Sequence, residues 1–233
     1  MSNNSPPNLL TASVGKKIIM AVSGIIVIGF VIVHLIGNLQ LFIGQEQLNK
    51  YAETLQNLGV LKWCFRIFIL AFFGFHVWKG FVLWLENKKA RPVSYTKDVT
   101  LEASLSSRTM IWTGGLIFSF VVYHLLHYTM IITNPEYAII PLVDGRFDVY
   151  SMVILGFQNY LISGIYIIAI LLMSFHLSHA ISSLFQTLGL NNPNTLPKLK
   201  IFSNLVAVII FCGYVSMPIA VLLNIIKLPG GGN

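Results

Sequence analysis

The sequence carries very little charge. Asp, Glu, Lys and Arg together make up 10% of its 233 residues, whereas a typical soluble domain is about 25% charged. Acidic residues are scarcer than basic ones, with 8 Asp and Glu against 15 Lys and Arg. The basic residues are spread thinly through loops and form no dense patch. They give no sign of nucleic-acid binding and are better interpreted as markers of orientation in a membrane.

The sequence also lacks the marks of several protein classes. It has two cysteines, Cys64 and Cys212, both inside apolar runs, so we expect no disulfide framework and predict that both are buried packing residues. No glycine-rich phosphate loop or nucleophile triad occurs in the loops, which argues against a soluble enzyme. The first apolar run is too long for the core of a signal peptide, and we expect it to be a retained membrane helix.

Long apolar runs are what the sequence has instead. Hydrophobic residues make up 55% of the chain, and the mean hydropathy is +0.75. A helix needs about 20 apolar residues to cross about 30 Å of hydrocarbon. The runs that meet this length predict helices at about 17–41, 62–85, 109–132, 153–189 and 200–226. The expected fold is all-α, an integral membrane bundle of five transmembrane helices in one domain that spans residues 1–233.

The loops predict the orientation of this bundle. Nine basic residues lie in the N-terminal flank and in the loops after the second and fourth helices, whereas five lie on the other side. The positive-inside rule therefore puts the N-terminus in the cytoplasm and the C-terminus outside. Residues 43–60, in the first outer loop, are expected to form a short amphipathic helix on the membrane surface.

All six histidines lie inside apolar segments. At 1.5 Å per helical residue, His34 lies about 25 Å and His124 about 24 Å from the cytoplasmic ends of their helices. His76 and His176 lie about 15 Å from the cytoplasmic ends of theirs. These four histidines therefore form two level pairs, one outer and one inner, separated in depth by about 10 Å.

Paired imidazoles on facing helices can bind a flat metal macrocycle from both sides, as in bis-histidine ligation of haem. A single membrane histidine can equally serve as a hydrogen-bonding group between helices, but four in matched pairs favour ligands. Zinc or a di-iron centre is less attractive because no Cys, Asp or Glu lies near them in the helices. By periodicity alone, His127 and His179 are interchangeable with the candidates three residues before them.

Several segments of the sequence resemble one protein family. They are KKIIMAVSGIIVIGFVIVHLIGN, LNKYAETLQNLG, FHVWKG, TGGLIFSFVVYHLLHY and MSFHLSHAISSLFQTLGL. Together they resemble the di-haem cytochrome b subunit of succinate:quinone oxidoreductases, the succinate dehydrogenases and fumarate reductases with one large membrane anchor. The resemblance covers nearly all of residues 15–225 and keeps five helices in the same order.

The resemblance implies two haem b groups and their ligands. His34 and His124 would bind the outer haem iron, and His76 and His176 the inner one. A flavoprotein subunit and an iron–sulfur subunit would dock on the cytoplasmic face of the cell's inner (cytoplasmic) membrane, with the dicarboxylate chemistry on the flavoprotein. This chain would anchor them and relay electrons to or from a quinone, for which menaquinone is the usual partner of the di-haem type.

Other assignments are hypotheses about single residues. Glu53 and Tyr51, in the outer segment after the first helix, are candidates for the quinone site, although a charge such as Glu53 on a surface helix is often only solvated. Lys79 and Arg108 are candidate partners of haem propionates. The alternatives for the whole chain are a di-haem cytochrome b of another quinone-linked dehydrogenase, and a non-redox membrane anchor or transporter.

Overall fold

The computed structural model describes residues 13–89, 105–190 and 192–230. These residues form α-helices joined by short 3-10 and π segments, and their only β pairing is an isolated bridge between Val143 and Arg146. In chain order the elements are α1 Ser13–Asn38, η1 Leu39–Phe42, α2 Gln45–Gln56, α3 Val60–Lys89, α4 Leu105–His124, η2 Leu125–Thr129, η3 Pro135–Ile139, α5 Val149–Gln158, α6 Tyr160–Thr187 and α7 Leu196–Leu222. The expected all-α class is confirmed.

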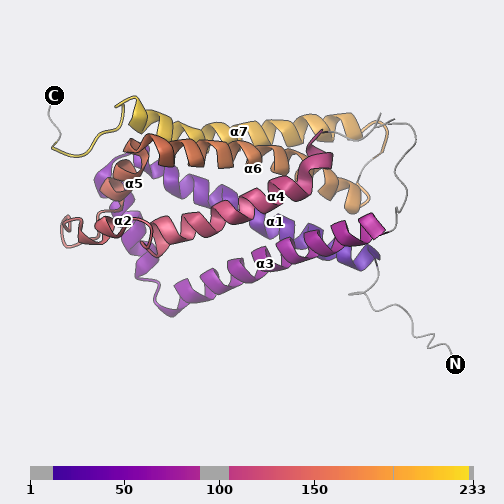
Figure 1. The fold of residues 1–233 in the computed structure, drawn as a ribbon, viewed down its shortest axis with the longest axis horizontal. Helices are drawn as coiled ribbons and strands as arrows, with labels where there is room; N and C mark the ends of the chain where they lie inside the picture. The colour runs from indigo at the N-terminus through magenta and orange to yellow at the C-terminus, as the bar shows by residue number, and fades with distance from the viewer. Residues whose placement is uncertain (1–12, 90–104, 191, 231–233) are drawn as a thin grey trace.

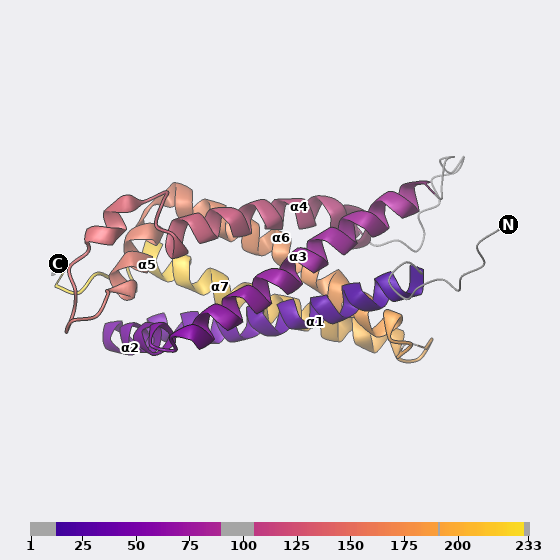
Figure 2. The same cartoon turned by 90° about the horizontal axis from the view of Figure 1, so that it is seen from below.

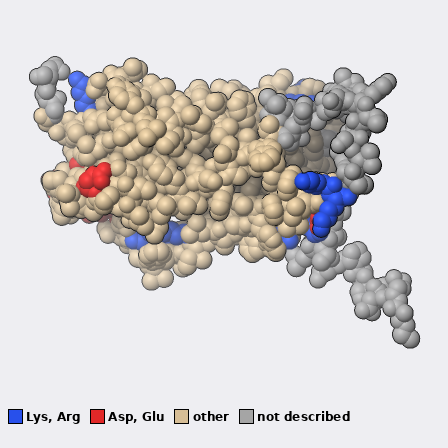
Figure 3. Space-filling model, viewed as in Figure 1, with Lys and Arg blue, Asp and Glu red and all other residues tan. Residues whose placement is uncertain are grey.

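Five of the described segments are long and apolar enough to cross a membrane. They are Gly15–Phe42, Val60–Lys89, Thr109–Thr129, Tyr160–Thr187 and Leu196–Leu222. A chain with five such segments is a multi-pass membrane protein. In Figure 3 the charged side chains visible on one face of the molecule lie toward the two ends of the bundle, with an uncharged band between them.

The fourth predicted helix, 153–189, is two helices. α5 ends at Gln158, and α6 begins at Tyr160. Asn159 makes the break because its backbone is extended and its side-chain oxygen accepts hydrogen bonds from the backbone N–H groups of Leu161 and Ile162. Asparagine is a favoured residue at the start of a helix for this reason. The sequence run was longer than a bilayer needs because part of it lies in a separate short helix.

The third predicted helix, 109–132, loses its regular α geometry earlier than expected. α4 ends at His124 and continues as the π segment η2 as far as Thr129. Ile131 then adopts a positive φ of 52°, which ends the helix before the predicted boundary. π segments are frequent at functional sites, and this one begins directly after a histidine.

Two smaller expectations have opposite outcomes. The short helix expected within residues 43–60 is confirmed as α2. The prediction that the cysteines are buried is wrong, because Cys64 on α3 and Cys212 on α7 are both exposed free thiols.

The five long helices run side by side, with α2, α5 and the C-terminal segment at one end of the bundle (Figure 1). We call this the α2 end. α6 packs against both α7 and α4, and α1 packs against α3, α6 and α7. α3 crosses α1 obliquely (Figure 2). Most of the buried apolar cluster comes from α5, α6 and α7.

α3 and α4 are packed far less tightly than the rest. Lys79 is the only buried residue of α3, and Thr113 is the only buried one among the described side chains of α4. Helices in a membrane associate through packing contacts and hydrogen bonds, and α3 and α4 bury few side chains for such contacts within the described bundle.

A buried polar cluster fastens α2 to α5. The carboxylate of Asp148, which precedes α5, accepts hydrogen bonds from Gln45 at 2.8 Å and Asn49 at 2.9 Å, both on α2. It also accepts one from the backbone N–H of Ser151 at 3.1 Å, and so caps α5. Asn49 in turn accepts from the backbone N–H of Tyr150 at 3.0 Å.

Candidate functional site

The structure brings four of the six histidines together as two facing pairs. His34 on α1 and His124, the last residue of α4, have ring centroids 5.8 Å apart and ring planes at 78°. They lie near the α2 end, and we call them the α2-end pair. Their pairing agrees with the depth count made from the sequence.

The second pair lies near the middle of its helices. His76 on α3 and His176 on α6 have ring centroids 6.4 Å apart, with ring planes at 67°. We call these residues the mid-bundle pair. All four rings are half-buried. Because α3 and α6 are otherwise not in close contact, the two imidazoles face each other across the lightly packed part of the bundle.

The two pairs are farther apart than the sequence predicted. Ser23 on α1 contacts His76, and it lies eleven residues before His34 on the same helix. This spacing corresponds to about 16 Å along α1, against the expected separation of about 10 Å. The expectation was too small because α3 runs obliquely across α1, so each of its residues adds less than its full rise to the depth (Figure 2).

Each of the four paired rings is held at Nδ1 by a side chain from the bundle. In the mid-bundle pair, Nδ1 of His76 lies 3.4 Å from the hydroxyl of Ser23, and Nδ1 of His176 lies 3.2 Å from the hydroxyl of Thr113. No side chain that the structure describes is seen to hydrogen-bond Nε2 of either ring, and the His76 ring also interacts with the backbone oxygen of Met20.

The α2-end pair follows the same rule with different partners. Nδ1 of His34 lies 3.3 Å from the side-chain nitrogen of Asn38, which also donates to the His34 carbonyl oxygen. Nδ1 of His124 lies 3.1 Å from the hydroxyl of Tyr166 on α6. Across residues 13–89, 105–190 and 192–230, no hydrogen bond reaches Nε2 of either ring. In the described part of the chain, the side-chain hydrogen bonds of the four paired rings are thus made at Nδ1.

His127 differs from its neighbour His124 in this respect. It is fully buried, and both of its nitrogens are engaged: Nδ1 lies 2.9 Å from the hydroxyl of Tyr166 and Nε2 lies 3.4 Å from the hydroxyl of Tyr137. Burial raises the pKa of Tyr137 to about 12, with a contribution from Glu136, so this phenol keeps its proton at neutral pH. His127 is therefore a satisfied structural histidine, whereas His124 faces His34.

His179 is not opposite another histidine. It lies one turn after His176 and is half-buried, but the ring that meets His76 is that of His176. The geometry thus distinguishes His124 from His127, and His176 from His179, which helical periodicity alone left interchangeable.

The paired rings fit the binding of one metal ion between them. A metal–imidazole bond is about 2 Å long, so two imidazoles on opposite sides of one metal have ring centroids about 6 Å apart. The observed separations of 5.8 and 6.4 Å are of this size. Neutral imidazoles that donate a hydrogen bond from the other ring nitrogen are the donor set that holds haem iron from both faces. The hydroxyl partners of His76, His176 and His124 can accept such a bond, whereas the Asn38 nitrogen beside His34 is a donor. Within the described ranges, no three His, Cys, Asp or Glu side chains cluster as a metal centre.

Lys79 lies on α3 one turn after His76 and is buried. Its ammonium group lies 4.4 Å from the ring centroid of Trp78, and no ion pair joins it to a carboxylate among the described residues. A buried cation with only an aromatic partner suits a bound anionic group. Arg108 lies within α4, but its side chain is outside the described part of the structure.

The structure does not bring the two candidate quinone residues to one point. The ring of Tyr51 lies against Gly37, one turn after His34, where an added Cβ would be 2.6 Å from the Tyr51 hydroxyl oxygen. Glu53 instead forms an ion pair with Arg146, in which Oε2 of Glu53 lies 2.8 Å from Nε of Arg146. Residues two apart on a helix point in different directions, so Tyr51 faces the bundle near His34 and Glu53 faces the loop that contains Arg146.

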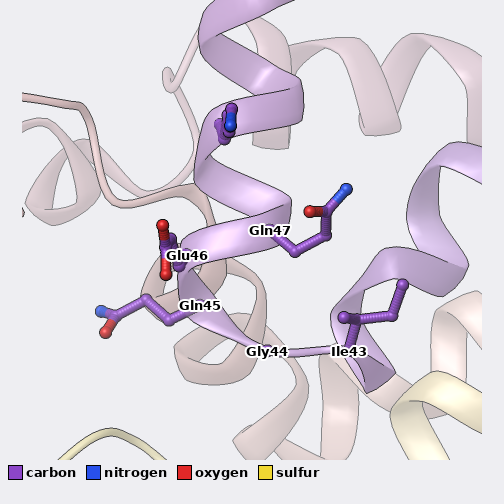
Figure 4. A pocket seen from close by; sticks show the side chains of 6 residues that line it. Ile43, Gly44, Gln45, Glu46 and Gln47 are labelled. Carbon is purple, nitrogen blue, oxygen red and sulfur yellow. The ribbon is translucent and has the colours of Figure 1, made fainter.

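Two surface pockets of the described structure have no paired histidine in their lining. A shallow one at the α2 end is lined by Ile43, Gly44, Gln45, Glu46, Gln47 and Lys50. Figure 4 shows Gln45 and Glu46 pointing to one side of this turn and Gln47 to the other, so their polar groups do not converge. An apolar groove between α1 and α3 is lined by Ile18, Ile19, Val22, Ser23, Phe72 and Phe75. It reaches the hydroxyl residue that contacts His76.

Sequence reasoning found the four paired histidines but missed the residues that hold them, which are Ser23, Asn38, Thr113 and Tyr166. Ser, Thr and Tyr are common in membrane helices, and a single one gives no signal. No family model matches this chain, and no curated protein or solved structure matches it.

Proposed function

We propose that this chain is a membrane electron relay that holds two haem b groups, one between His34 and His124 and one between His76 and His176. The observation that carries the proposal is the presence of two facing histidine pairs on four helices, each ring with a polar side chain at Nδ1 and, among the described residues, no side-chain hydrogen bond at Nε2. Haem bound between two imidazoles supplies one-electron chemistry.

The chain's own residues would do four things in this relay. The imidazoles provide Nε2 ligands, and their Nδ1 partners fix the orientation of each ring. The apolar helices exclude water, which governs the redox potential of a bound group. Lys79 adds a positive charge one turn from His76, where it would compensate an acidic substituent of the bound group.

The wider assignment is the di-haem membrane subunit of a succinate dehydrogenase or fumarate reductase, in the inner membrane with the N-terminus in the cytoplasm. The described ends support this orientation: the end opposite to α2 carries Lys16, Lys17, Lys88, Lys89, Lys198 and Lys200. That end would receive the iron–sulfur and flavoprotein subunits. The quinone, with menaquinone as the expected type, would react near the α2-end pair, where the ring of Tyr51 lies against Gly37, one turn after His34.

The test is a reduced-minus-oxidised spectrum with haem quantitation on the purified chain and its four single His→Ala variants. Two b-type haems per chain are expected, with one or both lost in each of the four variants. His179→Ala is the matched control and should retain both haems, because His179 faces no second histidine. A colourless wild-type chain would refute the relay. The partner subunits that copurify with the chain distinguish this assignment from another quinone-linked dehydrogenase.

A further inference from the structure

Two helices of the bundle carry the same short sequence pattern. On α1 the pattern starts at Ser23 and ends at His34, and on α4 it starts at Thr113 and ends at His124. In both helices a glycine follows the hydroxyl residue, and the histidine comes eleven residues after it. Eleven residues are close to three helical turns, so the hydroxyl residue and the histidine lie on the same face of their helix.

Each copy of the pattern reaches both histidine pairs. Its histidine belongs to the α2-end pair, whereas its hydroxyl contacts a ring of the mid-bundle pair. Ser23 Oγ lies 3.4 Å from Nδ1 of His76, and Thr113 Oγ1 lies 3.2 Å from Nδ1 of His176. The mid-bundle pair is therefore held from both sides by equivalent positions of α1 and α4.

The glycine of each pattern lies against the same imidazole as its neighbouring hydroxyl. A Cβ at Gly24 would be 3.5 Å from Cε1 of His76, and one at Gly114 would be 3.4 Å from Cε1 of His176. These are ordinary van der Waals distances, so each position has room for a methyl group between the helix backbone and the ring. The hydroxyl is therefore the group of each pattern that contacts the ring directly.

The hydrogen bonds of the two hydroxyl groups favour one tautomer of both rings. A hydroxyl has one proton to donate. Ser23 Oγ donates it to the backbone oxygen of Met20 at 3.1 Å, and Thr113 Oγ1 donates it to the backbone oxygens of Thr109 and Met110, each at 3.1 Å. Each oxygen is then left to accept a proton from the imidazole. A neutral imidazole carries one N–H, so Nδ1 is protonated and Nε2 keeps its lone pair.

We infer that Ser23 and Thr113 are positioning residues for the mid-bundle haem, which hold His76 and His176 in the tautomer that leaves Nε2 free to bind iron. The inference rests on the proposed function. Hydrogen bonds that a ligating imidazole donates also raise its basicity, which stabilises the ferric state. Removal of either hydroxyl should therefore raise the midpoint potential of this haem.

The effect should be confined to one haem. In the α2-end pair, His34 has the amide nitrogen of Asn38 at Nδ1, which is a donor, and His124 has the phenol of Tyr166. Neither ring contacts Ser23 or Thr113. The two haems thus report separately, and the α2-end haem is an internal reference.

The experiment is a potentiometric titration of both haems in membranes that contain the full chain. Thr113→Val keeps the shape of the side chain and removes the hydroxyl, and it should raise the potential of one haem by about 59 mV, which corresponds to a tenfold change for a one-electron couple. Ser23→Ala should shift the same haem in the same direction. Thr113→Ser keeps the hydroxyl and should restore the wild-type value.

Ser203→Ala is the matched control. Ser203 on α7 is as buried as Ser23, and its hydroxyl donates to the backbone oxygen of Leu199 at 2.7 Å without contacting an imidazole. The inference is overturned if Thr113→Val and Ser23→Ala have the same haem potentials as Ser203→Ala. It is also overturned if Thr113→Ser behaves like Thr113→Val. The proposed function survives both of these results. A wild-type chain without haem refutes the proposed function itself.

Discussion

The hydroxyl of Tyr166 on α6 lies 3.1 Å from Nδ1 of His124 on α4. The same oxygen lies 2.9 Å from Nδ1 of His127, whose Nε2 is 3.4 Å from the hydroxyl of Tyr137. For His124 to offer Nε2 as a ligand, its Nδ1 must donate to Tyr166, which then donates to His127, which in turn donates to Tyr137. Every group in this chain has one proton to give and one site to receive it.

Tyr166→Phe should therefore impair the α2-end pair selectively. It removes the acceptor of His124 and leaves the buried Nδ1 of His127 unpaired, which costs about 1–3 kcal/mol of folding free energy. We expect a changed midpoint potential for the α2-end haem and an unchanged one for the mid-bundle haem in a potentiometric titration. Tyr160→Phe is the control, since Tyr160 is on the same helix and 79% exposed. An equal shift in both haems would contradict the selective role.

His127→Ala should lower stability and leave both haems bound. The ring is fully buried, so its loss creates a cavity and leaves the Tyr137 hydroxyl without its imidazole partner, whereas the Tyr166 hydroxyl keeps His124. The expected cost is about 2–5 kcal/mol in unfolding free energy. Thermal unfolding and haem content per chain are the measurements. His124→Ala is the comparison variant, and it should lose haem. Haem lost only in His127→Ala would reverse the roles of the two residues.

The long helices and the two pairs were predictable from the sequence because both depend on local regularities. Run length gave the helices, and a constant rise per residue placed His34 level with His124. The break at Asn159 was not predictable from hydropathy, since a single polar residue inside an apolar run is common. The choice between His124 and His127 depends on where α4 changes to π geometry and on Tyr166, which is far away in the sequence. Such contacts follow from tertiary packing and leave no periodic signal.

Lys79→Met should lower the potential of the mid-bundle haem. If the buried ammonium compensates an acidic substituent of the bound group, its removal favours the ferric state, by on the order of 1 kcal/mol. Lys88→Met is a close control because Lys88 also lies over a tryptophan on α3, at 5.4 Å from the ring centroid of Trp84, but is exposed. If the redox titration curve of Lys79→Met superimposes on that of the wild type, Lys79 does not interact with the mid-bundle haem.

Asp148→Ala should release α2 from α5. Burial acts to raise the pKa of Asp148, but hydrogen bonds from Ser151, Asn49 and Gln45 outweigh it and hold the pKa below its usual value. Loss of these bonds should cost about 2–4 kcal/mol, seen as faster amide hydrogen exchange in α2. Asp144→Asn, at an exposed turn position, should leave exchange unchanged.

The lowered pKa of Asp148 also predicts a pH dependence. A carboxyl group with a lower pKa in the folded state contributes stability that is fully present above its unfolded pKa, about 3.9, and is lost as the pH falls through the folded value. Between pH 5 and 7, at least about 1 pH unit above the unfolded pKa, the carboxyl group is ionised in both the folded and the unfolded state. Its titration should therefore not change the exchange of the α2 amides in the wild type over this range. It should accelerate below about pH 4, and Asp148→Ala should lack this acid transition.

Glu53 has two possible roles that variants can distinguish. Its carboxylate either exchanges protons with the quinone or only forms the ion pair with Arg146. Glu53→Gln removes the charge and the pairing with Arg146 at once, whereas Arg146→Gln removes only the pairing and leaves the carboxylate. If Glu53 exchanges protons with the quinone, Glu53→Gln should abolish quinone turnover with both haems bound, and Arg146→Gln should retain most of it. If the carboxylate only fastens α2 to the 143–146 turn, the two variants should behave alike, with losses of about 1 kcal/mol in stability or less, as exposed ion pairs show. Normal turnover in Glu53→Gln would leave Tyr51, whose ring lies against Gly37 one turn after His34, as the residue to change next.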